Sequence, residues 1–344
     1  MIELRYMLLP LKAGISDITN FLSKLTLGKI FNAVLIYKSY YLSKILHKPI
    51  HWGMPVSASI EATTNCNLCC PECPAGLRKF SRPTGTLGPQ EFQNYINQLK
   101  KHLTYLVIYF QGEPYLNKSF FDFVKYAKSG KIYTATSTNG HYLDDDNARQ
   151  TIMSGLDRLI ISLDGTDQES YSSYRAGGDF EKVINGIKNV VEWKKKLKTT
   201  KPYIIIQFLV LKTNEHLIAE IRELSKYLGV DKLQLKTAQF YDYMNGNPLM
   251  PVKTKYSRYQ KQSEGTYSLK KKIKNHCLRM WRTLIITWDG KVIPCCFDKN
   301  AQYVLGDLNT TSLKDILKSD EYDAFRNKLM KNRKSIDICN NCTE

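Results

Sequence analysis

The strongest pattern in the chain is an alternation of short apolar runs with amphipathic helical segments. Helical periodicity marks the segments between the runs, and several of them end in Gly, a usual stop signal. The alternation predicts an α/β fold of parallel βα units, and near-continuous apolar strands are typical of a sheet buried on both faces. Right-handed crossovers would curl such units into a barrel or partial barrel. The expected strands lie within residues 56–62, 103–110, 131–137, 156–164, 202–210 and 231–237.

The flanking segments follow different patterns. Residues 15–48 predict two helices rich in Leu, Ile, Tyr and Lys, with apolar residues at helical spacing. We expect this segment to pack on the main domain, and a helix pair on a membrane surface is the alternative. Residues 241–276 are polar, basic and rich in turn residues, which predicts a linker or an exposed basic arm. The predicted domains are a helical segment (1–50), a core barrel (51–240), the linker (241–276) and a small C-terminal module (277–344).

Composition narrows the choice of partners and compartment. The 344 residues include 50 Lys and Arg against 32 Asp and Glu, a net charge of +18. Such a balance suits an acidic partner such as nucleic acid, anionic lipid or an acidic substrate, although a solvated basic surface is the simpler explanation. We find neither a cleavable signal peptide nor a run of ~18 apolar residues, and therefore expect a cytoplasmic protein. Peripheral membrane contact through residues 15–48 is the alternative. In the cytosol, clustered cysteines bind metal more often than they form disulfides.

Residues 66–73 read CNLCCPEC and hold four of the nine cysteines. They can be divided as Cys66-x3-Cys70-x2-Cys73, with Cys69 left over, or as a series that begins Cys66-x2-Cys69. The cluster follows the first predicted strand, at the end of a barrel that usually carries the chemistry. Three thiolates on one loop can hold three irons of a [4Fe–4S] cube and leave the fourth iron open. A structural zinc site would need four closed ligands.

The first of these spacings resembles the signature of the radical S-adenosylmethionine (SAM) superfamily. The resemblance implies a partial (β/α)6 TIM-type barrel and a [4Fe–4S] cluster whose open iron binds SAM. It also implies a 5′-deoxyadenosyl radical that abstracts hydrogen from a substrate. Later motifs resemble those of the family in the same order, although Gln111 replaces the first Gly of Gly-Gly-Glu-Pro. By this resemblance the cluster ligands are Cys66, Cys70 and Cys73, and the SAM-binding residues are Gly112, Glu113, Pro114, Thr138, Asn139, Ser162, Asp164 and Arg175.

A second set of cysteines occupies the C-terminal module. Asp289-Gly290 between two apolar runs predicts a hairpin that brings Cys277 and Cys295 toward one another. With a Cys-x2-Cys pair near residue 340, these would make a closed four-thiolate site for zinc or iron–sulfur. The arrangement resembles the SPASM/twitch extension of radical SAM enzymes, in a form with one auxiliary [4Fe–4S] cluster. The resemblance implies that this cluster is held by Cys277, Cys295, Cys339 and Cys342.

Other residues near these cysteines have less certain roles. The two spare cysteines, Cys69 and Cys296, are expected to be buried small hydrophobes, although one could ligate a cluster in another state. Arg279, Trp281 and Arg282 could tune the auxiliary cluster through nearby charge, or could be surface residues beside a hairpin.

The resemblance implies a radical SAM oxidoreductase or maturase that takes electrons from a donor such as flavodoxin or ferredoxin. An oxidation is favoured because an auxiliary cluster can accept the second electron. We expect a small molecule or sugar as substrate, since ~50 residues ahead of the barrel are too few for a peptide-binding domain. The alternative is a peptide- or protein-modifying maturase. A zinc-stabilised basic module that binds nucleic acid is the non-enzymatic alternative, but no recognition motif for nucleic acid accompanies it.

Overall fold

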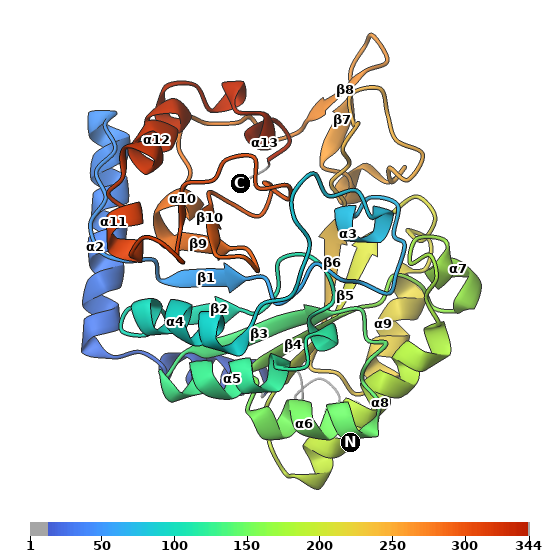
Figure 1. Ribbon diagram of the computed structural model, residues 1–344. Helices are drawn as coiled ribbons and strands as arrows, with labels where there is room; N and C mark the ends of the chain where they lie inside the picture. Colours follow the sequence, from blue (N-terminus) through green and yellow to red (C-terminus); the bar gives the residue numbers. More distant parts are fainter. Residues whose placement is uncertain (1–12, 343–344) are drawn as a thin grey trace. The chain divides into compact units, whose positions relative to one another are not determined.

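The computed structural model describes residues 13–342. These residues form two compact units (Figure 1), and each is built from separate stretches of chain. The first unit contains the residues up to Phe21, then Cys66–Lys79 and Ala135–Lys271. The second contains Leu22–Asn65, Phe80–Thr134 and the residues from Lys272 onward. The second unit therefore combines the N-terminal helix and the first two predicted strands with the C-terminal module.

Parallel strands in the order β3, β4, β5 and β6 form the sheet of the first unit. Every residue of β5 is buried or half-buried, as its apolar run predicts. Helix α8 buries one apolar face that includes Val183 and Ile187, while its last turn carries three lysines. The bounds are β3 Tyr133–Thr138, β4 Arg158–Ser162, β5 Tyr203–Val210, β6 Lys232–Thr237, α3 Pro74–Leu77, α6 Asp145–Ser154, α7 Gln168–Ser172, α8 Phe180–Lys196 and α9 Ile218–Tyr227.

The second unit has β2, β1 and β9 as parallel neighbours, and β10 and β11 extend this sheet in antiparallel fashion. Its strands are β1 Ser57–Ile60, β2 Tyr105–Val107, β9 Thr283–Ile286, β10 Lys291–Ile293 and β11 Gly306–Asp307. Its helices are α2 Leu27–Leu46, α4 Pro89–Leu99, η1 Pro114–Leu116, α5 Phe120–Ser129, α10 Arg279–Arg282, α11 Leu313–Ile316, α12 Asp320–Asn332, η3 Arg333–Ser335 and α13 Asp337–Asn340.

The six strands expected from the apolar runs are confirmed as β1 to β6, and the α/β class is confirmed with them. The predicted C-terminal hairpin is also confirmed, since β9 and β10 are antiparallel neighbours. Helix α2 and a helical stretch at residues 13–22 match the two helices expected within residues 15–48.

The segment 241–276 contains more structure than a linker or an exposed arm. It forms η2 (Thr254–Tyr256) and an antiparallel pair, β7 (Tyr259–Lys261) and β8 (Tyr267–Leu269). Tyr259 and Met250 are buried in an apolar cluster that also contains Cys70 of the first cysteine loop. Tyrosine and methionine side chains hidden among lysines supply this packing, which the overall polarity of the segment obscures.

Candidate functional site

The first cysteine loop is held by its own backbone. Cys70 is buried, Cys66 and Cys73 are half-buried, and all three are free thiols. The main-chain N–H of Cys73 donates to the carbonyl of Cys70 at 3.3 Å, and Cys73 then caps α3, whose first residue is a proline. Gly76 lies against the turn, where an added Cβ would be 2.6 Å from the Cys70 nitrogen. Only glycine fits there, a constraint that sequence reasoning missed because no local pattern marks it.

An ion pair between the half-buried Arg175 and the buried Asp164 lies beside Cys70. The Nε of Arg175 donates to Oδ2 of Asp164 at 2.6 Å, while its Nη1 is 3.9 Å from the Cys70 sulfur. Asp164 is fully buried, and its other oxygen accepts from the Leu209 N–H at 2.6 Å. Burial raises the pKa of the Cys70 thiol, and the Arg175 charge opposes that rise. Two of the predicted SAM-binding residues are thereby brought to the cysteine loop by contacts that no short motif specifies.

Asn139 approaches the loop from the end of β3. Its Nδ2 donates to Asn67 at 2.8 Å and lies 3.9 Å from the Cys66 sulfur. The ring and main-chain nitrogens of His141 are 3.1 and 3.0 Å from the Asn139 Oδ1, which fixes the orientation of the amide. Thr138 ends the strand and accepts from the Gly140 N–H at 3.1 Å. The predicted Thr-Asn-Gly turn therefore presents its asparagine to the first cysteine.

Ser162 ends β4, where it is paired in register with Gln207 of β5. Its side chain is buried at the carboxyl end of the strand, two residues before Asp164. The position agrees with the predicted place at the ends of parallel strands, where ligand sites form in such sheets. Its role in SAM binding remains a prediction.

The Gly112-Glu113-Pro114 turn lies in the second unit, against the backbone that precedes the first cysteine. Gly112 has a φ of +71°, and a Cβ there would be 2.3 Å from the Thr63 carbonyl. The Glu113 N–H donates to the Asn65 carbonyl at 2.7 Å. Its buried carboxylate caps η1 by accepting from the Tyr115 N–H at 3.2 Å. Close backbone approach explains the glycine, whereas the part assigned to Glu113 in SAM binding is still a prediction.

The four C-terminal cysteines line one cavity in the second unit. Burial raises the pKa of Cys295 well above its usual range and that of Cys339 to about 11. The buried guanidinium of Arg333 opposes the rise at Cys339, and its Nη2 donates to the Cys342 sulfur at 3.1 Å. Sequence reasoning missed Arg333, which precedes the last cysteine pair in the chain. The cavity is lined by Cys277, Arg279, Met280, Pro294, Cys295, Phe297, Phe325, Leu329, Arg333, Ile338, Cys339 and Cys342.

The three residues predicted to surround the first ligand of this set have different surroundings. Arg279 donates to the sulfur of the spare Cys296 at 2.9 Å. Trp281 is a core residue, not a surface one: it is 2% exposed, donates to the Ile50 carbonyl and has the Arg326 guanidinium over its ring. Arg282 ends α10 and is half-buried.

The spare cysteines also differ from one another. Cys296 packs against an apolar cluster around Ile285 and Ile293, but it is half-buried where a buried residue was expected. Cys69 is exposed, so the expectation that it is buried is wrong. Its N–H donates to the Ala176 carbonyl at 2.8 Å, which turns the side chain of this position outward while its neighbour Cys70 is buried.

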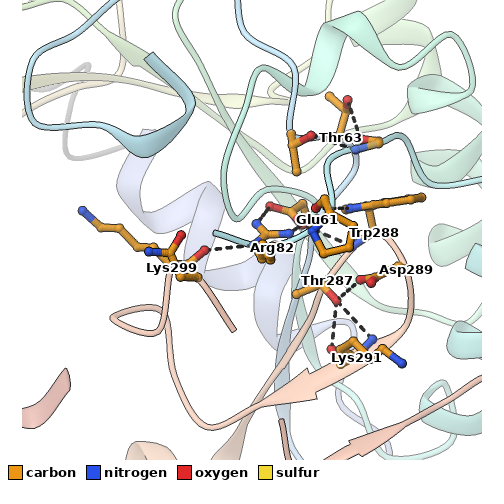
Figure 2. Close-up of polar contacts among 12 residues, drawn as sticks. Glu61, Thr63, Arg82, Thr287, Trp288, Asp289, Lys291 and Lys299 are labelled. Atoms are coloured by element: carbon orange, nitrogen blue, oxygen red, sulfur yellow. Dashed lines mark hydrogen bonds and ion pairs between the residues drawn. The ribbon is translucent and has the colours of Figure 1, made fainter. Parts of the chain in front are cut away.

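A buried ion pair supports the hairpin that leads to the second set of cysteines. Both oxygens of Glu61 accept from Arg82, at 2.6 and 2.8 Å, and neither side chain is more than 6% exposed. Figure 2 shows that the Trp288 N–H also donates to Glu61, and that Arg82 reaches the Lys299 carbonyl. The Trp288 ring occupies the space beside Gly85, where a Cβ would be 2.5 Å away. The pair therefore joins β1, the segment after residue 80 and the hairpin turn.

The donor sets fit thiolate-held iron–sulfur groups. In residues 13–342, no three His, Cys, Asp or Glu side chains lie close enough together for a single metal ion. A four-iron cube places each thiolate on a separate iron, and therefore needs them farther apart than one ion does. Besides the exposed Cys69, the first loop offers the three thiols of Cys66, Cys70 and Cys73, and the second set offers four around one cavity. An arginine lies beside each set and suits an anionic cluster.

Known families match both regions. The model of the "Radical SAM superfamily" matches residues 60–206, and that of an "Iron-sulfur cluster-binding domain", SPASM, matches residues 277–343. A relative described as "Tungsten-containing aldehyde ferredoxin oxidoreductase cofactor-modifying protein" of Pyrococcus furiosus is 26% identical over 78% of this chain and 82% of its own length. "PqqA peptide cyclase" of Rhodopseudomonas palustris is 25% identical over 58% of this chain and 52% of its own.

A solved structure shares the fold. BtrN in complex with AdoMet and 2-DOIA aligns with 85% of this chain and 94% of its own, with a TM-score of 0.53 and 19% identity. The likeness supports the predicted partial barrel with a small C-terminal domain. None of the helices among residues 13–342 combines the length and apolar character needed to cross a membrane.

Proposed function

We propose that this chain, a member of the radical SAM superfamily with a C-terminal SPASM iron–sulfur domain, oxidises a small molecule or sugar. When bound, its cofactors are SAM, a [4Fe–4S] cluster and an auxiliary cluster, and they supply a 5′-deoxyadenosyl radical and an electron acceptor. The family assignment favours this enzyme over the zinc-stabilised nucleic-acid module.

In the proposed first site, Cys66, Cys70 and Cys73 would hold three irons of the cluster. The observation that carries the proposal is the placement of Asn139 beside Cys66 and of the Arg175–Asp164 pair beside Cys70. A guanidinium fixed through its Nε, with Nη1 toward Cys70, keeps Nη2 for the carboxylate of SAM. Asp164 holds the guanidinium in that orientation, and the Asn139 amide, held by His141, orients polar groups at the first cysteine.

The remaining predicted SAM contacts are also part of the proposal. In the proposal, the Gly112-Glu113-Pro114 turn meets the amino group of SAM, for which a carboxylate is the natural partner. Thr138 and Ser162 provide hydroxyl groups at the ends of β3 and β4. These residues would bind and orient SAM, and excluding water from this region would protect a radical from side reactions.

The second site supports an oxidation. Cys277, Cys295, Cys339 and Cys342 supply four thiolates, so a cube held by all four has no open iron for a substrate. Such a closed cluster is suited to electron transfer, and the substrate radical left after loss of a hydrogen atom must lose one more electron to become an oxidised product. A flavodoxin or ferredoxin would provide the first electron. A peptide- or protein-modifying maturase is the second candidate, favoured by the match to a peptide cyclase.

Anaerobic reconstitution followed by iron, sulfide and SAM-cleavage measurements tests the proposal. We expect about eight irons per chain and about four in a Cys66/Cys70/Cys73→Ala variant. With candidate substrates, an oxidation that returns its second electron should proceed with less than one reducing equivalent per product. A requirement for one equivalent per product would contradict the oxidation, and stoichiometric zinc without iron would contradict the whole proposal.

A further inference from the structure

Helix α2 is amphipathic, but its buried face is largely polar and its exposed face is apolar. The face that packs on the second unit carries Lys29, Asn32, Ser39 and Ser43, together with Ile36 and Tyr40. The outward face carries an apolar stripe: Leu27 is 87% exposed, Phe31 65%, Val34 55% and Ile45 70%. Leu27, Phe31 and Val34 are three or four positions apart, and Tyr41, 54% exposed, continues the same side of the helix toward Ile45. The stripe therefore follows one side of α2 (blue in Figure 1), with the exposed Lys38 near its middle.

Polar contacts hold the helix in this rotation. The Lys29 ammonium donates to the Lys131 carbonyl at 2.6 Å and to the Gly130 carbonyl at 3.3 Å. Asn32 exchanges two hydrogen bonds of 2.8 Å with the backbone of Met54, and Ser43 makes two with that of Ile50. Turning the apolar stripe inward would leave these buried groups without partners, which proteins rarely tolerate. The outward direction of the stripe is therefore built into the packing of α2.

An exposed apolar stripe of this kind indicates that a binding partner covers it. Contiguous exposed apolar surface marks interaction sites, and here an open hollow along the helix is lined by Ile30, Val34 and Tyr37. Tyr41 and Trp52 are also exposed on this unit, and amphipathic aromatic side chains of this type favour the boundary between water and lipid.

The charges around the stripe indicate which occupant it takes. Residues 18–60 contain five lysines and no Asp or Glu. Lys38, Lys44 and Lys48 are exposed, and the Lys38 ammonium lies 5.8 Å from the centre of the Trp52 ring. A second copy of the chain would bring the same lysines together across a two-fold axis, and protein interfaces are depleted in lysine. Lysines that extend from an apolar stripe instead suit the phosphates of anionic lipid.

We propose that the outward face of α2 attaches this protein to an anionic membrane surface, with the helix lying in the plane of the headgroups. The Leu27, Phe31, Val34 and Ile45 side chains enter the acyl boundary, and Lys38, Lys44 and Lys48 contact headgroup phosphates. This attachment requires no spanning helix, because one apolar stripe with flanking cations binds reversibly from one side.

Vesicle flotation of the reconstituted full-length enzyme tests the proposal. The probes are vesicles of phosphatidylcholine alone and vesicles with about one third phosphatidylglycerol, each at low and high salt. We expect flotation with the anionic vesicles and release by salt. A Phe31→Ser/Val34→Ser variant should bind at least tenfold more weakly, whereas a Met153→Ser/Tyr227→Ser control, at side chains 61% and 78% exposed, should bind like the wild type.

Two further readouts separate the proposal from its competitors. SAM cleavage should be equal in wild type, variant and control, so that loss of vesicle binding is independent of the proposed enzymatic function. Light scattering should give the same mass for all three. Undiminished flotation of the α2 variant, or failure of the wild type to bind anionic vesicles, would overturn the proposal. A wild-type dimer that becomes a 39.7 kDa monomer in the variant would also overturn it, by assigning the stripe to a second copy.

Discussion

The two cysteine sets differ in how the chain builds them. The first places three thiols on one loop of eight residues, stiffened by its own turn and by a helix that begins at the next residue. The second collects four thiols from positions 277–342, before α10, after β10, within α13 and just beyond it. One set is specified by local spacing and the other by tertiary packing. The proposed open three-thiolate site and the proposed closed four-thiolate site would thus be made by different physical means.

The largest expected effect compares one cysteine from each set. Cys70→Ala should abolish SAM cleavage, because two thiolates cannot hold the cluster to which SAM binds. Cys342→Ala should leave SAM cleavage measurable but stop product formation, since only the closed cluster is lost. Iron content and 5′-deoxyadenosine formation measure the two effects. Equal loss of SAM cleavage in both variants would remove the functional distinction between the sets.

The next effect concerns tertiary support. Glu61→Gln leaves the buried Arg82 charge without its carboxylate and should destabilise the protein by about 3–5 kcal/mol. The control Glu223→Gln breaks a pair in which both side chains are more than 60% exposed and should cost less than about 1 kcal/mol. Urea unfolding under anaerobic conditions measures both. If Glu61→Gln lowers the free energy of unfolding no more than the control does, the ion pair has no structural role.

A third variant tests whether the first cysteine loop is shaped by its own turn. Gly76→Ala places a methyl group against the Cys70 backbone, which should cost about 1–3 kcal/mol and lower the iron content of the first site alone. Gly28→Ala, where a Cβ would meet nothing closer than 4.0 Å, is the control. Mössbauer spectra report each site. Iron lost equally from both sites would show that the first loop is not built locally.

A fourth prediction is a pH dependence of the second unit. Burial and the Arg326 charge lower the pKa of His51 to about 3, from 6.5 in an unfolded chain. Between those values the unfolded state binds more protons, so the free energy of unfolding falls as the pH falls through this window. The expected loss between pH 7.5 and pH 5 is about 2 kcal/mol. His51→Gln should remove that component of the slope in urea unfolding, and an unchanged slope would contradict the assignment.

The smallest expected effect is on the closed cluster itself. Arg333→Met removes a positive charge that contacts Cys339 and Cys342. One-electron reduction of the auxiliary cluster should become less favourable by an amount on the order of 1 kcal/mol, so its reduction potential should become more negative. The surface variant Arg222→Met should leave the potential unchanged in the same redox titration. A potential that does not move in Arg333→Met would exclude this arginine from tuning the cluster.

Sequence patterns predicted the parts of the fold that are determined by residues close together in the sequence. Apolar runs predicted β1 to β6 because strands buried on both faces leave a continuous signal. The Asp289-Gly290 turn predicted the hairpin because the residue types that form a turn are adjacent in the sequence. The family motifs named Asn139 and Arg175, both of which lie beside the first cysteine loop.

The residues that sequence patterns missed act through contacts that exist only in the folded chain. Arg82 and Glu61 are 21 positions apart, and nothing in either segment marks them as partners. Gly76 is required by space that only the folded loop creates. The reversed face of α2 was hidden because an apolar stripe at helical spacing is ordinarily the buried one, and only the polar contacts of Lys29 and Asn32 fix its direction.

The most direct test of the contrast between an open and a closed site is electron paramagnetic resonance of the reduced protein with and without SAM. In a Cys277/Cys342→Ala variant, which retains only the first site, SAM should change the spectrum, because it binds the open iron. In a Cys66/Cys70/Cys73→Ala variant, which retains only the second, SAM should leave the spectrum unchanged. A SAM-induced change in the second variant, or none in the first, would contradict the account.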